Sequence, residues 1–164
     1  MTNDKQADNG SLLSRLQARL DRAGVSDENL LAVLDELLSH FQCVTGTIHD
    51  MNPADGMLRL RAQRGIPAVI LDRVRSIPIG KGMAGIAAER RQPVQVCNLQ
   101  TDSSGVAKPA ARETRMEGSI AVPMLPADHL CGVLGVAKPV AYEFTEAETA
   151  QLVEIANRLG EYLR

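Results

Sequence analysis

The sequence has few aromatic residues and no surplus of basic charge. Aromatic side chains make up 2% of its 164 residues, tryptophan is missing, and the formal net charge is −2 at pH 7. Proteins that read single-stranded nucleic acid stack its bases on aromatic rings, and binding to a phosphate backbone requires a basic surface. The composition therefore argues against nucleic acid as a direct ligand, and we expect no nucleic-acid partner.

Long apolar segments and paired cysteines are also missing. No apolar run approaches the roughly 20 residues that cross a bilayer, and the polar start lacks the apolar core of a signal peptide. The three cysteines, Cys43, Cys97 and Cys131, are odd in number and show no C-x-x-C spacing. This usage is typical of thiols in a reducing compartment, so we expect a cytoplasmic protein without a membrane partner.

Helical patterns open and close the sequence. Leucines at helical spacing precede Gly24, and Ser26 is then in position to cap a second helix that ends near Phe41. Near the C-terminus, Thr145 and Glu148 match a capping box before a last helix with one apolar face. Apolar stripes of this width must be buried against another layer of structure.

Between these helices the apolar period changes to two, which is typical of half-buried strands. The segments that we expect to be strands are 44–49, 57–62, 94–99, 119–125 and 130–137. Hairpins pair antiparallel, so the sequence predicts an α/β (α+β) domain with one central antiparallel sheet covered by helices. We expect residues 1–25 to form an N-terminal helical extension and residues 26–164 to form the domain itself.

The glycines from Gly80 to Gly85 match the G-x-G-x-x-G pattern of dinucleotide-binding folds, with Asp102 near the position of the expected acid. That fingerprint requires a buried parallel strand before the glycines. Here Pro78 precedes them and antiparallel hairpins follow. We therefore interpret the segment as a tight backbone turn in which side chains would clash.

Four blocks of sequence resemble the GAF domain family, in the order in which that family carries them. They are IPIGKGMAGIAAERRQPV at 77–94, MEGSIAVPML at 116–125, GVLGVA at 132–137 and EFTEAE at 143–148. The resemblance runs from about Asn29 to Tyr162. It implies a sheet of about five to six strands, with the first and last helices on one face. A ligand pocket would lie on the other face, under a long polar loop at 101–118.

The resemblance also implies where a ligand would bind. The residues expected to line the pocket are Cys97, Asn98, Leu99, Asp102, Ser103, Ser104, Arg112, Met116 and Ser119. Arg112 is the natural partner for an anionic group because a guanidinium can form two parallel hydrogen bonds with a carboxylate. A solvated loop cation is the alternative for this residue. His49, Cys97 and His129 lack metal-ligand spacing, so we predict no metal site, and no cofactor is indicated.

Subfamilies of the GAF resemblance can be compared with particular residues. The Asn-Lys-x-Phe-x-x-x-Asp-Glu signature of cyclic-nucleotide binders and the Cys-His pair of bilin binders are both absent. Free methionine-(R)-sulfoxide reductases carry a cysteine at the position of Ala84, so their mechanism does not carry over. Segment 96–102 is more loosely similar to sensor domains of nitrogen-fixation-type activators. Cys97 is either a reactive thiol or an inert, buried one.

These observations favour a small-molecule-sensing GAF domain that forms a homodimer through its N- and C-terminal helices. Leu31, Leu38 and Val153 are the apolar residues that we expect to meet the partner copy. Two alternatives stay open. One is a thiol-dependent enzyme related to free methionine-(R)-sulfoxide reductase, and the other is a protein-interaction module without a ligand. No residue pattern requires catalysis, and we predict no catalytic residue.

Overall fold

The computed structural model describes the backbone of residues 3–164 and the side chains of residues 12–164. Its helices are α1 (Asn3–Ala23), α2 (Asp27–Phe41), α3 (Ala68–Arg75), α4 (Gly82–Arg90), α5 (Pro109–Glu113) and α6 (Glu146–Leu163), with a 3-10 turn η1 (Pro126–Asp128). Its strands are β1 (Thr45–Asn52), β2 (Met57–Arg64), β3 (Ser76–Pro78), β4 (Val94–Val96), β5 (Ser119–Met124) and β6 (Gly132–Ala137). The α+β class is confirmed.

The six strands form one sheet in the order β3-β2-β1-β6-β5-β4, and every neighbouring pair is antiparallel. The expectation of five to six strands in a single antiparallel sheet is therefore confirmed. The two edge strands differ most from the sequence prediction. The short edge strand β3 was not expected. Its Pro78 is tolerated because proline can occupy an edge position in a sheet. Strand β4 ends at Val96 rather than at Leu99.

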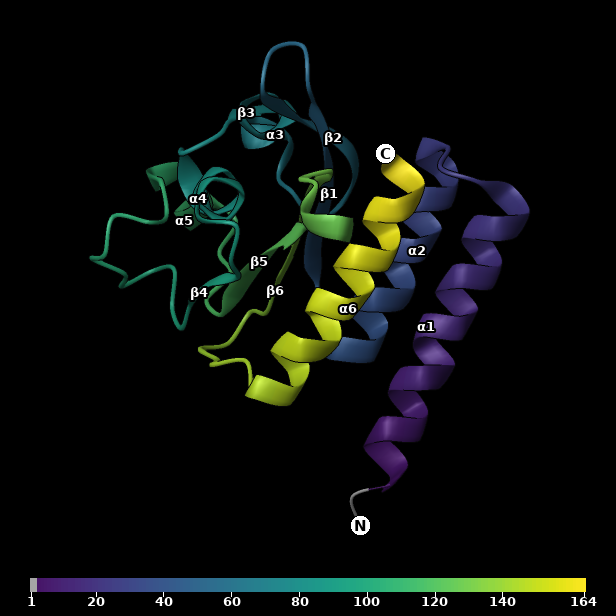
Figure 1. The fold of residues 1–164 in the computed structure, drawn as a ribbon. Coiled ribbons are helices and arrows are strands. Elements are labelled where there is room, and N and C mark those ends of the chain that lie inside the picture. The colour runs from purple at the N-terminus through teal and green to yellow at the C-terminus, as the bar shows by residue number, and fades with distance from the viewer. Residues whose placement is uncertain (1–2) are drawn as a thin grey trace.

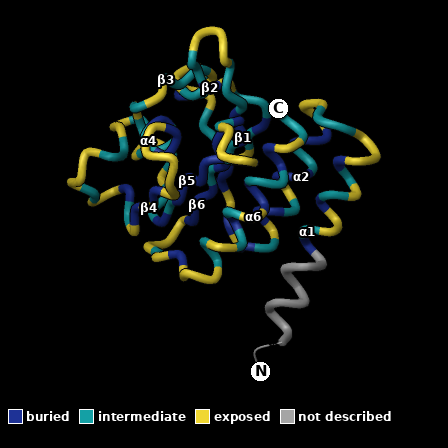
Figure 2. Tube along the Cα trace, viewed as in Figure 1, coloured by how far each residue is buried: buried dark blue, intermediate teal, exposed yellow. Residues whose placement is uncertain are grey.

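Helices α2 and α6 cover one face of the sheet, as expected (Figure 1). Their inward residues are fully buried, and Figure 2 shows buried residues gathered in the central strands and on the sides of both helices that face them. Both predicted caps are present. The Ser26 hydroxyl accepts from the backbone N–H of Asn29, and Thr145 and Glu148 form the reciprocal bonds of a capping box.

Helix α1 packs against α2 and α6 on the side away from the sheet (Figure 1). Leu12, Leu16 and Leu20 of α1 are each no more than 2% exposed. Leu38, which we expected to meet a partner copy, is also buried within this chain. Leu31 and Val153 are partly buried against the same core. Leu38 packs toward the sheet at Gly46, so it is not available to a partner copy.

Within the described part of the chain, we find no helix that is both long enough and apolar enough to cross a membrane.

Candidate functional site

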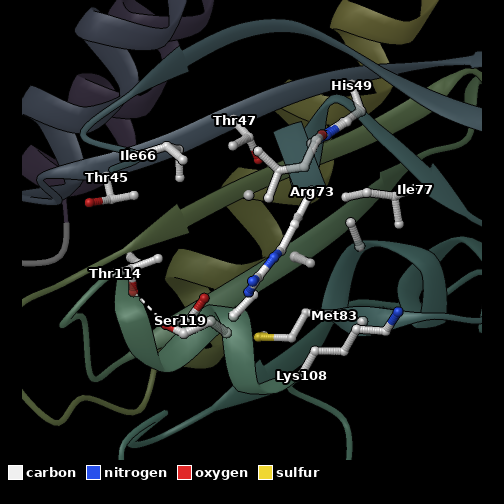
Figure 3. A pocket seen from close by; sticks show the side chains of 18 of the residues that line it. Thr45, Thr47, His49, Ile66, Arg73, Ile77, Met83, Lys108, Thr114 and Ser119 are labelled. Carbon is white, nitrogen blue, oxygen red and sulfur yellow. Dashed lines mark hydrogen bonds between the residues drawn. The ribbon is translucent and has the colours of Figure 1, made fainter. Parts of the chain in front are cut away.

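A cavity of about 460 Å³ lies on the face of the sheet opposite α2 and α6. Its floor consists of alternate residues on the three central strands, and most of them are small (Figure 3). They are Thr45, Thr47 and His49 of β1, Ser119 and Ala121 of β5, and Gly135 and Ala137 of β6. The space arises because these short side chains do not reach the helices on this side of the sheet.

Helices α3, α4 and α5 provide the walls and roof of the cavity, together with β3. Their lining residues are mainly apolar and include Ile70 and Val74 of α3, Ile77 of β3, Met83 and Ala84 of α4, and Ala110 and Ala111 of α5. We call residues 101–118, which include α5, the lid segment. Lys108, Ala110, Ala111 and Thr114 of this segment line the cavity, so the long polar loop lies over the pocket as expected.

The charged side chains that line the cavity are all cationic. They are Arg73 on α3, Lys81 at the N-cap of α4 and Lys108 at the N-cap of α5. In the described part of the chain, no aspartate or glutamate lines the cavity. A carboxylate of the lid segment, Glu113, lies 3.7 Å from Arg73, measured from Oε1 to Nη1. The cavity therefore combines an apolar interior with positive charge.

His49 is the most deeply buried polar residue of the cavity lining, with 1% of its surface exposed. Its Nε2 lies 2.7 Å from the carbonyl oxygen of Val74. Because a carbonyl can only accept, Nε2 carries the proton and donates. Burial lowers the pKa of His49 below its ordinary value, so the ring is neutral at pH 7. This hydrogen bond links β1 to the last turn of α3, so it fixes the helix above the cavity to the strand beneath it.

Two of the nine residues expected to bind the ligand, Leu99 and Ser119, line the cavity. The others do not line it. They are Cys97, Asn98, Asp102, Ser103, Ser104, Arg112 and Met116.

Several of these polar residues bond to one another or to the base of the lid segment instead. Asn98 Nδ2 donates to Glu117 Oε1 at 3.1 Å, and Arg112 Nη2 donates to the carbonyl oxygen of Asp102 at 3.0 Å. The Ser104 hydroxyl donates to the Asp102 carboxylate at 2.7 Å. Their place in the structure is therefore to give the lid segment its shape.

The remaining expected residues lie at the margins of the same network. The Met116 carbonyl accepts from the side-chain amide of Gln100 at 2.8 Å, and Ser103 and Arg112 are exposed. Cys97 is an exposed free thiol, and its carbonyl accepts from the backbone N–H of Tyr142. Cys97 follows the last residue of β4 and does not line the cavity.

The three cysteines are all free, and none of them lines the cavity. Cys43 and Cys131 are buried in the cluster beneath α2 and α6, on the other face of the sheet. Burial raises the pKa of the Cys43 thiol to about 11 and also raises the pKa of Cys131. Neither buried thiol is therefore available as a thiolate near neutral pH.

Sequence reasoning missed Arg73, Lys81 and Lys108, and it weighed His49 only as a metal ligand. A signal for His49 was present, because it shares strand alternation with Thr47 and so belongs on the same face. No comparable signal marks the cations. Their position depends on which turn of α3 or α4 comes to lie over the sheet.

The glycine-rich turn positions the start of α4 at the cavity wall. The backbone N–H of Gly80 donates to the carbonyl of Gly85 at 2.8 Å, and a Cβ on Gly85 would lie 2.4 Å from the carbonyl oxygen of Pro78. The strand before this turn is the antiparallel edge strand β3. The interpretation as a tight turn is therefore confirmed, and a dinucleotide fingerprint would need a parallel strand there.

Within the residues that the structure describes, no three or more histidine, cysteine, aspartate or glutamate residues come together in a group that could hold a metal ion.

The sequence and fold of this chain are similar to those of known proteins. The model of the GAF domain family matches residues 26–164. The GAF domain of a phosphoenolpyruvate-protein phosphotransferase from Coxiella burnetii is 19% identical, with a TM-score of 0.79 over 94% of this chain and 91% of that chain. Free methionine-R-sulfoxide reductase from Neisseria meningitidis, solved with its substrate, is 20% identical. Its TM-score is 0.79 over 99% of this chain and 92% of that chain.

At such identities these structures show a shared fold. A search of curated proteins finds no match to this chain.

Proposed function

Because this chain belongs to the GAF domain family, we propose that it is a sensor whose small-molecule ligand binds in the cavity between the sheet and the lid segment. The observation that carries the proposal is the cavity itself, which holds about 460 Å³ behind a largely apolar lining. Space of this size is typical of ligand sites, whereas protein interiors are otherwise close-packed. The positive charge of its lining supports an anionic ligand.

The contacts of Lys138 support a route for the signal from the lid segment to helix α2. The backbone N–H of Lys138 donates to the carbonyl of Gly118, and its carbonyl accepts from the N–H of Glu117, at the end of the lid segment. Its buried ammonium group donates to the carbonyls of Phe41 and Gln42 at the C-terminal end of α2. Ligand binding that moves the lid segment would therefore act on the helical layer through this lysine.

The proposal includes a homodimer that carries the signal through the N- and C-terminal helices. Because α1 already covers part of α2 and α6, a partner copy would meet the outer surfaces of these helices rather than Leu38. Light scattering coupled to size exclusion tests this part. A monomer at micromolar concentration contradicts it, whatever the ligand proves to be.

The ligand proposal is tested by native mass spectrometry. The wild-type domain is incubated with a small-molecule extract of bacterial cells, and the complex is measured after buffer exchange. Ala84→Leu and Ala111→Leu serve as matched variants, because both add a large side chain to the cavity lining on residues that favour helix. We expect a bound mass in the wild type that both variants lose. The absence of any bound mass from the wild type would contradict sensing.

The alternative of a thiol-dependent reductase has less support from the geometry. Reduction of a sulfoxide by thiols requires a thiolate beside the substrate sulfur. The cavity lining contains Ala84 and none of the three cysteines. We therefore expect no turnover of free methionine sulfoxide by the wild type. Turnover that disappears in a Cys97→Ser variant would overturn this expectation.

A further inference from the structure

We propose that Arg73 recognises a carboxylate on the ligand, and that Glu113 on the lid segment competes with the ligand for this arginine. The inference rests on the proposed function, since it takes the cavity to be a ligand site. It adds the class of the ligand, a carboxylate with an apolar body, and names the pair of residues that sets its affinity.

The cavity lining combines positive charge with an apolar surface. Three cations from three different elements line it, and in the described part of the chain no carboxylate does. Apolar side chains form most of the remaining surface. A ligand without charge would occupy the apolar interior and leave these cations unused. A carboxylate with an apolar body would use both, because its carboxylate can accept charge-assisted hydrogen bonds while its body fills the apolar interior.

Arg73 reaches the cavity from α3. Figure 3 shows its side chain extending from α3 across the cavity toward Thr114 and Ser119. Its ion-pair partner is Glu113, at 3.7 Å, which is longer than a hydrogen bond. The two side chains are 61% and 46% exposed, and an exposed pair of this kind contributes little to stability. Glu113 thus lies near the guanidinium without saturating its donors.

Arg73 can exchange Glu113 for a carboxylate of the ligand. A ligand carboxylate can accept two parallel hydrogen bonds from Arg73, at shorter distances than the Glu113 contact. Glu113 is the last residue of α5, whereas Arg73 belongs to α3. When the ligand takes the guanidinium, the ion pair between α3 and the lid segment is broken. Ligand affinity and the Arg73–Glu113 pair therefore oppose each other.

The chain contains a matched control for Arg73. Arg75 lies two residues after Arg73 on the same helix, is exposed, and does not line the cavity. Its guanidinium pairs with Asp72 on the surface of that helix, at 3.1 Å. An Arg75→Gln variant removes the same charge from the same helix, so it separates a general electrostatic effect from direct recognition by Arg73.

The experiment compares octanoate with octanamide, which has the same chain length and no charge. Binding is followed by ¹⁵N NMR titration of the wild type and of the Arg73→Gln, Glu113→Gln and Arg75→Gln variants. We expect the wild type to bind octanoate about tenfold or more tightly than octanamide, the range typical of charge-assisted pairs. Arg73→Gln should remove this preference, Glu113→Gln should tighten octanoate binding roughly two- to fivefold, and Arg75→Gln should change neither ligand's affinity.

Different outcomes overturn different parts. If octanoate and octanamide bind equally to the wild type, Arg73 does not select charge, while the proposed sensing function stands. If Glu113→Gln weakens octanoate binding, there is no competition. If neither compound shifts residues that line the cavity, the apolar carboxylate is the wrong class. The mass spectrometry of cell extracts then decides the sensing function independently.

Discussion

The two faces of the sheet differ in the size of their side chains more than in polarity. Along β6, Leu134 and Val136 point toward α2 and α6, whereas Gly135 and Ala137 point toward the cavity. Both sets lie on one strand and alternate residue by residue. The face with large residues is closed. The opposite face is hollow over Gly135 and Ala137, whereas Val133 at the other end of β6 packs with Leu58 and α4 in a second buried cluster. Strand alternation thus specifies a core and a binding site within the same six residues.

The two faces of the sheet should differ in how well they tolerate mutation. The closed face has no free volume, so it should respond strongly to both loss and gain of atoms. The hollow face should accept added atoms at little cost, because space is already present there. Substitutions on the two faces should therefore differ in their effect on the free energy of unfolding.

The largest effect is expected from Leu134→Ala on the closed face. Leu134 is 1% exposed and belongs to the main core cluster. Truncating it should leave a cavity and lower the free energy of unfolding by about 2–5 kcal/mol. Urea denaturation followed by circular dichroism measures the change. A loss below about 1 kcal/mol would show that this face is less tightly packed than the structure implies.

A matched pair of glycines tests the comparison most directly. A Cβ on Gly46 would lie 2.9 Å from methyl groups of both Leu34 and Leu38, on the closed face. A Cβ on Gly135 would lie 3.0 Å from the Thr47 hydroxyl, which borders the cavity and has room to turn. We expect Gly46→Ala to cost about 1–3 kcal/mol, and Gly135→Ala to be neutral or to stabilise by up to about 1 kcal/mol.

The two alanine variants are measured side by side by urea denaturation, so that differences in the unfolded state largely cancel. Equal losses in both would contradict the distinction between the two faces.

Local sequence patterns predicted the closed face well. Leucine spacing identified the inward sides of α2 and α6, and Ser26 and Thr145 were correctly expected to cap them. These features depend on contacts within a few residues or on simple periodicity, which a sequence displays directly. The covering of α2 by α1 was missed, because one apolar stripe can be buried against its own chain or against a partner.

The hollow face was predicted in outline and not in its residues. The position of the pocket and its lid segment followed from the family resemblance, yet only Leu99 and Ser119 of the expected residues line it. Polar loop residues such as Asp102 and Arg112 were expected to face a ligand, but they satisfy their hydrogen bonds with one another. The cation Arg73 reaches the cavity from a helix whose position over the sheet is a tertiary feature.

A smaller effect, dependent on pH, is expected from His49 on the hollow face. Burial lowers its pKa in the folded state, so the unfolded chain binds a proton more readily there. Its contribution to stability is complete above the unfolded pKa of about 6.5 and falls as pH decreases below that value. The slope should reach at most about 1.4 kcal/mol per pH unit until the folded pKa is reached.

The measurement is the free energy of unfolding at pH 7.5 and at pH 5.5. A His49→Gln variant keeps an N–H donor for the Val74 carbonyl but has no group that titrates in this interval, so it should show a flatter pH dependence. The wild-type and variant curves would run parallel if His49 were not the group responsible.

The smallest effect on stability is expected from Cys97, which lies outside both the core cluster and the cavity lining. Its thiol is exposed, whereas Cys43 is buried under α2 with its pKa raised to about 11. Alkylation requires an accessible thiolate. Iodoacetamide should therefore modify Cys97 first in the folded protein, and Cys43 and Cys131 should react only when the closed face opens.

Peptide mass spectrometry after timed alkylation gives the order of reaction, and Cys97→Ser should change the free energy of unfolding by no more than about 0.5 kcal/mol. The rate at Cys43 then reports how often the helical layer separates from the sheet. If Cys43 reacted as fast as Cys97, the closed face would be open on the time scale of labelling. The contrast between a rigid core and a yielding binding face would then fail, because both faces would admit small molecules.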